Sequence, residues 1–249
     1  MRDRVRELLD FDLMLLDSIV RGRLSLSLED VAHPLPRLSP PVRFVGFDEA
    51  GRGALAGPVV VACVHIDVFR SPSSPGFDRE RLSKALAGLD DSKRVTQRRR
   101  EALHAAIVSE SDWGVGCASA LEIDRRGIVT ACRLAARRAS ASLPVEADVG
   151  LFDRGLSVAG GETATSFAEL ELTRGDGRSL HIAAASILAK VARDAIMVRL
   201  AQRFPGYSLA QHKGYGTAAH REAIRRLGPS PIHRRSFCTR IETVEIQSC

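Results

Sequence analysis

The sequence lacks the features of a membrane protein or a secreted protein. No apolar run approaches the ~18 residues that a membrane span needs, and the longest candidate, residues 11–20, contains Asp12 and Asp17. The N-terminus has neither the basic start nor the small-residue cleavage site of a signal peptide. We therefore expect a cytoplasmic protein that does not enter a membrane.

Cysteine and lysine are both scarce. The five cysteines are an odd number without a C-x-x-C pair, which predicts reduced thiols instead of a disulfide framework or a zinc site. Of the 36 Lys and Arg residues only four are lysines. Three of these, Lys93, Lys190 and Lys213, lie inside the motifs described below. Because a lysine is a compact ammonium, Lys93 and Lys213 are interpreted as phosphate contacts, whereas a structural role is equally compatible with Lys190.

The net charge of +6 is unevenly distributed along the chain. Residues 1–41 carry six basic and seven acidic groups, a net of −1, whereas residues 199–240 carry nine basic groups and only Glu222, a net of +8. Such a segment can attract a polyanion through counterion release. A solvated arginine-rich helix is the alternative, and charge alone favours neither.

The length of 249 residues predicts one compact domain with an extension. Apolar residues at spacings of three and four predict an amphipathic helix over 3–20, and four prolines predict a linker over 22–41. We therefore divide the chain into an N-terminal helical extension with its linker (1–41), a catalytic core (42–198) and a basic helical C-terminal part of the same domain (199–249).

From residue 42 onward, predicted strands and helices alternate. The predicted strands are 42–47, 59–66, 113–118, 148–152 and 167–172. The predicted helices are 97–109 with Thr96 as N-cap, 121–142, 182–204 and 218–227 with Thr217 as N-cap. This order indicates an α/β or α+β protein with helices covering a central sheet.

Four carboxylates lie at the ends of predicted elements. Asp48 and Glu49 stand between the first strand and a glycine-rich turn, so we expect the strand to stop before them; Asp153 ends another strand, and Asp176 lies in a turn. Each also fits an ordinary turn. Together they offer hard oxygen donors, which suit Mg²⁺ or Mn²⁺, and such ions can activate water for phosphodiester hydrolysis. The sequence does not show that the four converge.

Five motifs resemble those of the ribonuclease HII family and follow that family's order over roughly 42–240. They are FDEAGRG at 47–53, DDSK at 90–93, AAASILAKVARD at 183–194, QHKGYGT at 211–217 and HRRSF at 233–237. Five ordered motifs are far more specific than any one of them.

The resemblance implies a ribonuclease H-like fold, a central mixed β-sheet flanked by helices, with a helical C-terminal part. It implies that Asp48, Glu49, Asp153 and Asp176 are catalytic residues that bind Mn²⁺ or Mg²⁺. It also implies that Gly51, Arg52 and Gly53 contact the ribose 2′-hydroxyls, and that Tyr215 packs on the nucleotide after the ribonucleotide. Arg154 departs from the family, where glycine is more usual, and adds a cation beside the acidic residues.

The expected activity is an endonuclease, acting as a monomer, that hydrolyses the RNA strand of RNA–DNA hybrids. It would also nick duplex DNA at embedded ribonucleotides and leave 5′-phosphate and 3′-hydroxyl ends. A protein that binds hybrids with an inactive centre is an alternative. Strand transfer on the same fold is a second alternative, but the chain resembles none of the DNA-end-binding domains that this reaction needs.

Overall fold

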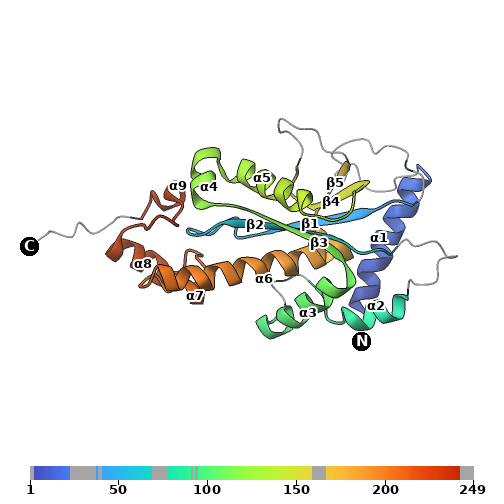
Figure 1. Cartoon of the computed structure of the whole chain (residues 1–249), viewed down its shortest axis with the longest axis horizontal. Coiled ribbons are helices and arrows are strands. Elements are labelled where there is room, and N and C mark those ends of the chain that lie inside the picture. The colour runs from blue at the N-terminus through green and yellow to red at the C-terminus, as the bar shows by residue number, and fades with distance from the viewer. Residues whose placement is uncertain are drawn as a thin grey trace, which may run out of the picture.

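The computed structural model describes residues 3–22, 38, 41–68, 78–90, 92, 95–158 and 167–241. In this part of the chain, a five-stranded sheet lies between helical layers (Figure 1). The strands are β1 (Phe44–Ala50), β2 (Val59–His65), β3 (Asp112–Ala118), β4 (Val149–Asp153) and β5 (Ala168–Leu172). The helices are α1 (Arg4–Val20), α2 (Arg79–Ala85), α3 (Gln97–Glu110), α4 (Ala120–Arg126), α5 (Ile128–Ala141), α6 (Leu180–Arg203), α7 (Leu209–His212), α8 (Ala218–Leu227) and α9 (Arg235–Cys238), and a 3-10 turn, η2, spans Gly175–Gly177.

The sheet is mixed, with strand order β3-β2-β1-β4-β5. β2 pairs antiparallel with β1 and β3, whereas β4 pairs parallel with β1 and β5. The register places Phe47 beside Phe152, so the next residues along β1 and β4, Asp48 and Asp153, approach the same edge of the sheet. A mixed sheet flanked by helices confirms the expected α/β architecture.

Two apolar layers cover the faces of the sheet. One contains residues of β1, β2, α4 and α5, and the other contains residues of β2, α3 and α6. α6 lies very close to β1, because a Cβ atom on Gly46 would be only 2.3 Å from the backbone carbon of His181. The alanine-rich face of α6 therefore fits the sheet without large side chains between them, and this brings the polar residues of α6 close to β1.

The predicted N-terminal helix is confirmed as α1, and it is embedded in the protein core. Leu8 and Leu15 are fully buried, and each belongs to an apolar cluster that includes residues of the sheet or of α6. The polar interruption of its apolar face, Asp12, is also buried and lies 2.7 Å from Nδ1 of His181 in α6. α1 is thus packed against the catalytic core by both apolar and polar contacts.

We expect Leu8→Ala to lower the free energy of unfolding by about 2–5 kcal/mol, because it removes a buried side chain that neighbouring residues cannot readily replace. Urea denaturation measures this change. Met14→Ala is the control, since Met14 lies on the same helix with 52% of its surface exposed. Equal small effects of both substitutions would show that α1 does not contribute to the stability of the core.

Two predictions about local structure need correction, and three short helices were not predicted. The strand expected to end at Phe47 continues through Ala50, because both carboxylates remain paired with β2. The single helix expected over 121–142 is divided into α4 and α5 at Gly127, whose φ of +75° ends the first helix. The short helices α2, α7 and α9 have no counterpart among the predicted elements.

The two predicted N-caps are confirmed. The side chains of Thr96 and Thr217 accept hydrogen bonds from the first turns of α3 and α8, as expected of N-caps. Within the part of the chain that the structure describes, Cys63, Cys117, Cys132 and Cys238 are free thiols, and no helix is both long and apolar enough to cross a membrane. Most of the predicted linker over 22–41 lies outside the described residues.

Candidate active site

Two aspartates lie side by side on the central parallel strands. The rings of Phe47 and Phe152 stack with their centroids 4.5 Å apart on one face of the sheet. Because side chains alternate along a strand, Asp48 and Asp153 point to the other face, where α6 packs. The parallel register of β1 and β4 therefore brings together two carboxylates that are 105 positions apart in the sequence.

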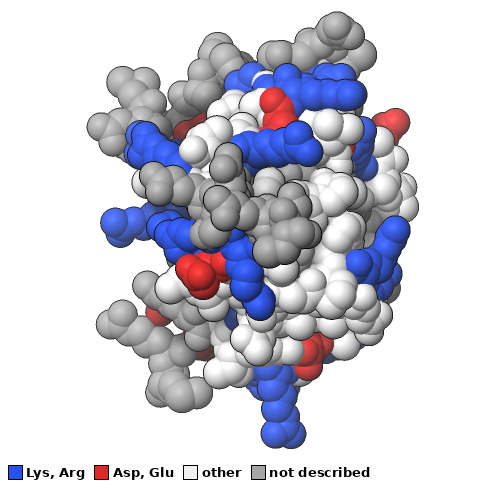
Figure 2. Space-filling view, turned by 90° about the vertical axis from the view of Figure 1, so that its left-hand side faces the viewer, with Lys and Arg blue, Asp and Glu red and all other residues white. Residues whose placement is uncertain are grey.

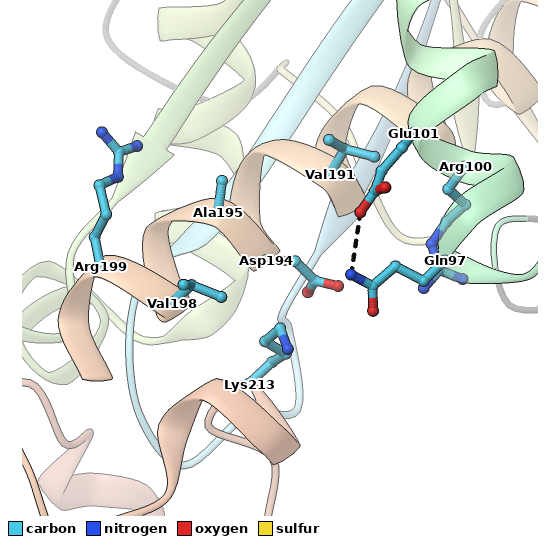
Figure 3. A pocket seen from close by; sticks show the side chains of 9 residues that line it. All are labelled: Gln97, Arg100, Glu101, Val191, Asp194, Ala195, Val198, Arg199 and Lys213. Atoms are coloured by element: carbon cyan, nitrogen blue, oxygen red, sulfur yellow. Dashed lines mark hydrogen bonds between the residues drawn. The ribbon is translucent and has the colours of Figure 1, made fainter. Parts of the chain in front are cut away.

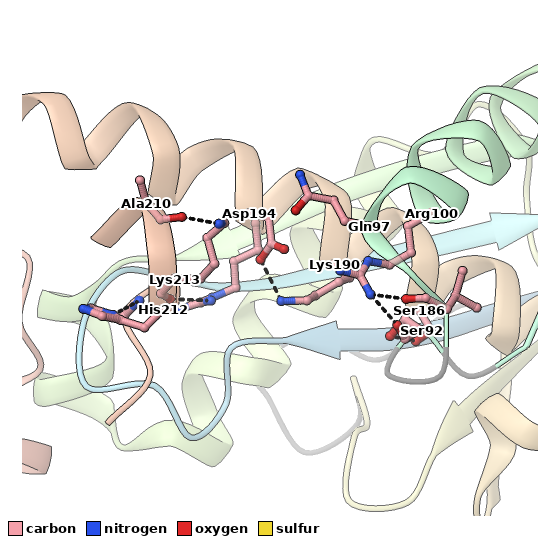
Figure 4. Close-up of polar contacts among 12 residues, drawn as sticks. Ser92, Gln97, Arg100, Ser186, Lys190, Asp194, Ala210, His212 and Lys213 are labelled. Atoms are coloured by element: carbon pink, nitrogen blue, oxygen red, sulfur yellow. Dashed lines mark hydrogen bonds and ion pairs between the residues drawn. The ribbon is translucent and has the colours of Figure 1, made fainter. Parts of the chain in front are cut away.

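Asp48 is held in an environment that disfavours its negative charge. Burial raises the pKa of the Asp48 carboxyl well above its usual range, and the charges of Glu49 and Asp153 raise this pKa further. A hydrogen bond from Ser186 of α6 opposes these effects. The hydroxyl oxygens of Ser186 and Ser92 lie 2.8 Å apart and share a hydrogen bond (Figure 4), so a short polar chain leads from the carboxylate to Ser92 of the DDSK motif.

Glu49 points toward the opposite face of the sheet from Asp48, because β1 continues past both residues. Its carboxylate accepts a hydrogen bond from Nη1 of Arg52 at 3.3 Å. Arg52 also donates to the carbonyl of Gly155, just after β4. The Glu49–Arg52 pair therefore links the end of β1 to the turn that follows Asp153.

The turn η2, which carries Asp176, is bonded to Asp153 through its first residue. The backbone N–H of Gly175 donates to Oδ1 of Asp153 at 2.7 Å, so the residue preceding Asp176 is bonded directly to the β4 carboxylate. Arg174 adopts a left-handed conformation with φ of 55°, which is uncommon for a side-chain-bearing residue. The structure thus places the residue before Asp176 against Asp153, while Glu49 and Asp153 are the groups whose charges act on Asp48.

The carboxylate oxygens at this edge of the sheet fit a divalent cation that also binds to substrate. Among the residues described by the structure, no three His, Cys, Asp or Glu side chains form a ready metal cage. Mg²⁺ is usually bound by one or two carboxylates together with waters and substrate phosphates, so an incomplete cage is compatible with such an ion. A cation would also offset the repulsion that raises the pKa of Asp48.

The segment 51–58, here called the glycine loop, leads from β1 into β2. Gly51 has φ of +92° and is buried, whereas Gly53 is exposed, and a Cβ atom added to it would meet no heavy atom within 4 Å. Gly53 is therefore not required for packing inside the protein. Its bare backbone is free to be approached from outside, as the proposed 2′-hydroxyl contact requires.

Tyr215 lies in the segment 213–217, here called the tyrosine loop, next to the glycine loop. The carbonyl oxygen of Gly214 accepts hydrogen bonds from the backbone of Leu55 at 2.8 Å and of Ala56 at 3.2 Å. The ring of Tyr215 is half-buried, with the guanidinium carbon of Arg193 5.0 Å from its centroid. The two predicted substrate-binding segments are therefore adjacent and hydrogen-bonded to each other.

The motif lysines have different surroundings. Lys190 pairs with Asp194 at 2.8 Å along α6 (Figure 4). Its ammonium also lies 5.6 Å from the Tyr215 ring centroid. Lys213 donates to the carbonyl of Ala210. Lys93 lies outside the described residues.

A pocket of about 340 Å³ lies between α3, α6 and the tyrosine loop (Figure 3). Val191, Ala195 and Val198 of α6 form its apolar side, with Lys213 and Arg100 at its rim. Lys213, the first residue of the tyrosine loop, thus lies at the edge of this pocket.

The basic C-terminal segment forms an arginine-rich end of the molecule. Figure 2 shows Lys and Arg side chains gathered on the face that carries the C-terminal helices. The exposed arginines of the segment are Arg199, Arg203, Arg221, Arg225, Arg226, Arg235 and Arg240. Arg234 is fully buried, so its charge, although part of the net +8, is not available on the surface.

Four residues that contact the acidic residues or the glycine loop were not predicted from the sequence to have a role. Ser186 contacts Asp48, Ser92 contacts Ser186, and Arg193 and Arg234 lie beneath the glycine loop. All four lie inside the family-like motifs, but their roles depend on burial and on which backbone carbonyls face them. Neither property can be read from residue type.

The fold and this acidic edge define a ribonuclease H-like hydrolase. The sequence model of the ribonuclease HII family matches residues 45–240 of this chain. The chain belongs to the ribonuclease HII family and is a ribonuclease H, which cleaves RNA in RNA–DNA hybrids. The alternative of a binding protein with an inactive centre is therefore not supported.

Relatives and solved structures agree with this assignment. The chain is 47% identical to ribonuclease HII of Moorella thermoacetica, covering 78% of this chain and 86% of the relative, and 46% identical to that of Syntrophotalea carbinolica, covering 78% and 85%. It is similar to ribonuclease H2 from Pyrococcus horikoshii, with TM-score 0.57, 25% identity and coverage of 81% and 97%. It shares the fold of Bst-RNase HIII in complex with Mn²⁺, with TM-score 0.52, 19% identity and coverage of 79% and 64%. The expected ribonuclease H-like fold is confirmed.

Proposed function

We propose that this ribonuclease H, besides cleaving hybrids, nicks duplex DNA at single embedded ribonucleotides and leaves 5′-phosphate and 3′-hydroxyl ends. The observation that carries the proposal is the direct contact between the glycine loop and the tyrosine loop through Gly214. One loop suits the 2′-hydroxyl of a ribonucleotide and the other suits stacking on the next nucleotide. Their adjacency allows both contacts to be made across one RNA-to-DNA junction.

Asp48, Glu49, Asp153 and Asp176 are proposed to bind Mn²⁺ or Mg²⁺ together with the scissile phosphate. Mn²⁺ is supported by its presence in the related RNase HIII complex. When bound, a divalent cation lowers the pKa of a water molecule and neutralises charge on the phosphate.

The residues of this chain would orient the reaction. Ser186 holds the Asp48 carboxylate by a hydrogen bond, and the Gly175 N–H holds that of Asp153. Arg52 fixes the end of β1 relative to the turn after β4. With both carboxylates held, the substrate phosphate meets groups that need little rearrangement before reaction.

The exposed C-terminal arginines are proposed to bind the phosphates of the hybrid on either side of the cleavage site. Lys213 and Lys93 are proposed to add further phosphate contacts. We propose that the protein acts as a monomer, since the site is built from one chain.

The proposal is tested by comparing two duplexes of equal length, one with an all-RNA strand and one with a single ribonucleotide in DNA. We expect the protein to cut both with Mn²⁺ or Mg²⁺, and end labelling to show a 5′-phosphate and a 3′-hydroxyl. An all-DNA duplex should remain intact. Cleavage of the hybrid alone would contradict the proposed action on embedded ribonucleotides.

Tyr215→Ala should reduce nicking at a single ribonucleotide by about 5- to 150-fold, because stacking of a base on an aromatic ring contributes ~1–3 kcal/mol. Tyr215→Phe is the matched control, since it keeps the ring and should retain nicking. Steady-state rates on the two duplexes measure the effect. An unchanged preference for the junction in Tyr215→Ala would remove Tyr215 from this role.

A further inference from the structure

Arg193 of α6 is fully buried beneath the glycine loop. Its Nε and Nη2 atoms donate to the carbonyl oxygens of Pro58 at 3.0 Å and Ala56 at 3.1 Å, both in the glycine loop. Its Nη1 atom donates to the carbonyl of Lys213 at 2.9 Å, in the tyrosine loop. One side chain therefore binds the backbone of both loops.

Arg234, also fully buried, binds the glycine loop from a second side. Its guanidinium donates to the carbonyls of Gly57 at 3.0 Å and Arg52 at 2.8 Å. Its backbone N–H donates to the carbonyl of Leu55 at 2.8 Å. The two arginines thus hold the glycine loop at four successive carbonyls, 55–58, and at that of Arg52, next to the exposed Gly53.

The glycines of the two loops leave the space that these contacts need. A Cβ atom on Gly51 would lie 1.9 Å from Nε of Arg193, so the guanidinium occupies the place of a side chain there. A Cβ atom on Gly214 would lie 2.5 Å from the carbonyl oxygen of Ala56. Gly51 and Gly214 are therefore required by the contact between the loops, in contrast to Gly53.

Carbonyl oxygens accept hydrogen bonds from all three guanidinium nitrogens of Arg193 and from Nε and Nη1 of Arg234, whereas Nη2 of Arg234 has no partner among the described residues. Burial lowers the pKa of Arg193, and it lowers the pKa of Arg234 to about 10, with the charge of Arg193 as a further cause. Burying a cation without a carboxylate partner opposes folding unless its N–H groups are well bonded. An arginine offers several N–H groups in a fixed plane, whereas a lysine offers a single nitrogen that cannot bond all of these carbonyls together.

We propose that Arg193 and Arg234 are positioning residues that hold the glycine loop and the tyrosine loop as one rigid unit. This inference rests on the proposed function, since it assigns the two loops to one ribonucleotide and its 3′ neighbour. Arg193 also lies against the ring of Tyr215, so it relates the stacking surface to the 2′-hydroxyl contact. At a single embedded ribonucleotide, the 2′-hydroxyl contact and the stacking contact can both form only when the duplex is bound at one position. A continuous RNA strand offers a ribose at every position.

The test is Arg193→Lys, which keeps the charge and removes the planar set of donors. For the single-ribonucleotide duplex we expect kcat to fall about 10²-fold with KM changed less than about threefold, as for a misplacement of groups near the reaction. For the hybrid we expect a fall of only about tenfold. The ratio of the two rates should therefore shift by about tenfold, which a general loss of folded protein would not produce.

Arg137→Lys is the matched control. Arg137 of α5 also donates to a backbone carbonyl, that of Val158, at 3.0 and 3.2 Å, but it contacts neither loop. It should alter thermal stability without changing the ratio. In a Tyr215→Ala background, Arg193→Lys should change the ratio no further, because residues that act through one contact are not additive.

An unchanged ratio in Arg193→Lys, an equal shift in Arg137→Lys, or full additivity with Tyr215→Ala would overturn the inference. Thermal melting of each variant sets an assay temperature at which it is folded. If Arg193→Lys does not fold, the ratio of the two rates is measured for Arg234→Lys instead, because this substitution leaves the Arg193 contacts in place. Failure of the unaltered protein to nick a single ribonucleotide would instead refute the proposed function. The inference would then be decided by kcat and KM of Arg193→Lys on the hybrid. A higher KM with unchanged kcat would overturn it.

Discussion

Asp48→Asn is expected to lower kcat on an RNA–DNA hybrid by at least about 10³-fold. Asp48 lies on the central strand beside Asp153, and its ionised carboxylate is proposed to bind the divalent cation at the scissile phosphate. Loss of several kcal/mol of charge stabilisation in the transition state corresponds to such a factor. An asparagine keeps the size of the side chain, so the hybrid should still bind through the arginine-rich end.

Asp17→Asn is the matched control for this substitution. Asp17 lies on α1, is exposed, and pairs with Arg21, so its loss should leave kcat unchanged. Cleavage is measured with Mn²⁺ and with Mg²⁺, and hybrid binding is measured in EDTA. Asp48→Asn with near-normal kcat under both metals would refute the assignment of this carboxylate.

The stability of the same variant should change in the opposite direction to its activity. Because the folded protein raises the pKa of Asp48, its ionised form opposes folding, and this penalty appears as the pH rises through that raised pKa. Without metal at neutral pH, Asp48→Asn should therefore melt at the same temperature as the unaltered protein or higher. Below the ordinary pKa of aspartate the difference should vanish. Mn²⁺ should raise the melting temperature of the unaltered protein more than that of the variant.

The sequence predicted the fold well because the strongest signals were local. Apolar periodicity predicted α1 and the long helix α6, and Thr96 and Thr217 were recognisable as caps. The break at Gly127 was missed because the apolar pattern continues across it. The extension of β1 past Phe47 was missed because the glycines that follow indicated an earlier turn, whereas pairing with β2 keeps Asp48 and Glu49 in the strand.

The acidic residues could be predicted only as candidates, since each also fits an ordinary turn. The parallel pairing of β1 with β4 brings Asp48 and Asp153 together, and the bond from Gly175 joins the turn that carries Asp176 to Asp153; both contacts join distant parts of the chain. The roles of Ser186 and Arg193 had no signal of their own. In the sequence, a buried arginine that is bonded to carbonyls cannot be distinguished from the many arginines on the surface.

Gly51 and Gly53 of the glycine loop are only two positions apart, yet substitutions at them should have opposite effects. Gly53→Val should lower kcat/KM on hybrids by about 10²-fold, because its side chain would enter the space in which the 2′-hydroxyl is proposed to approach the backbone. The folded protein itself has room for it, since no heavy atom lies within 4 Å of the added Cβ and Gly53 lacks a positive φ. Its melting temperature should therefore remain close to that of the unaltered protein.

Gly51→Ala supplies the contrast that separates substrate contact from scaffold. Its Cβ would meet Arg193, and its φ of +92° strains any side chain, so this variant should lose thermal stability. For Gly53 the loss should grow from Ala to Val and should affect cleavage more than binding, because the glycine loop acts at the reacting ribose while the arginine-rich end supplies affinity. If Gly53→Val lowered binding and cleavage equally, or lowered the melting temperature as Gly51→Ala does, the exposed glycine would belong to the scaffold and the 2′-hydroxyl contact would lie elsewhere.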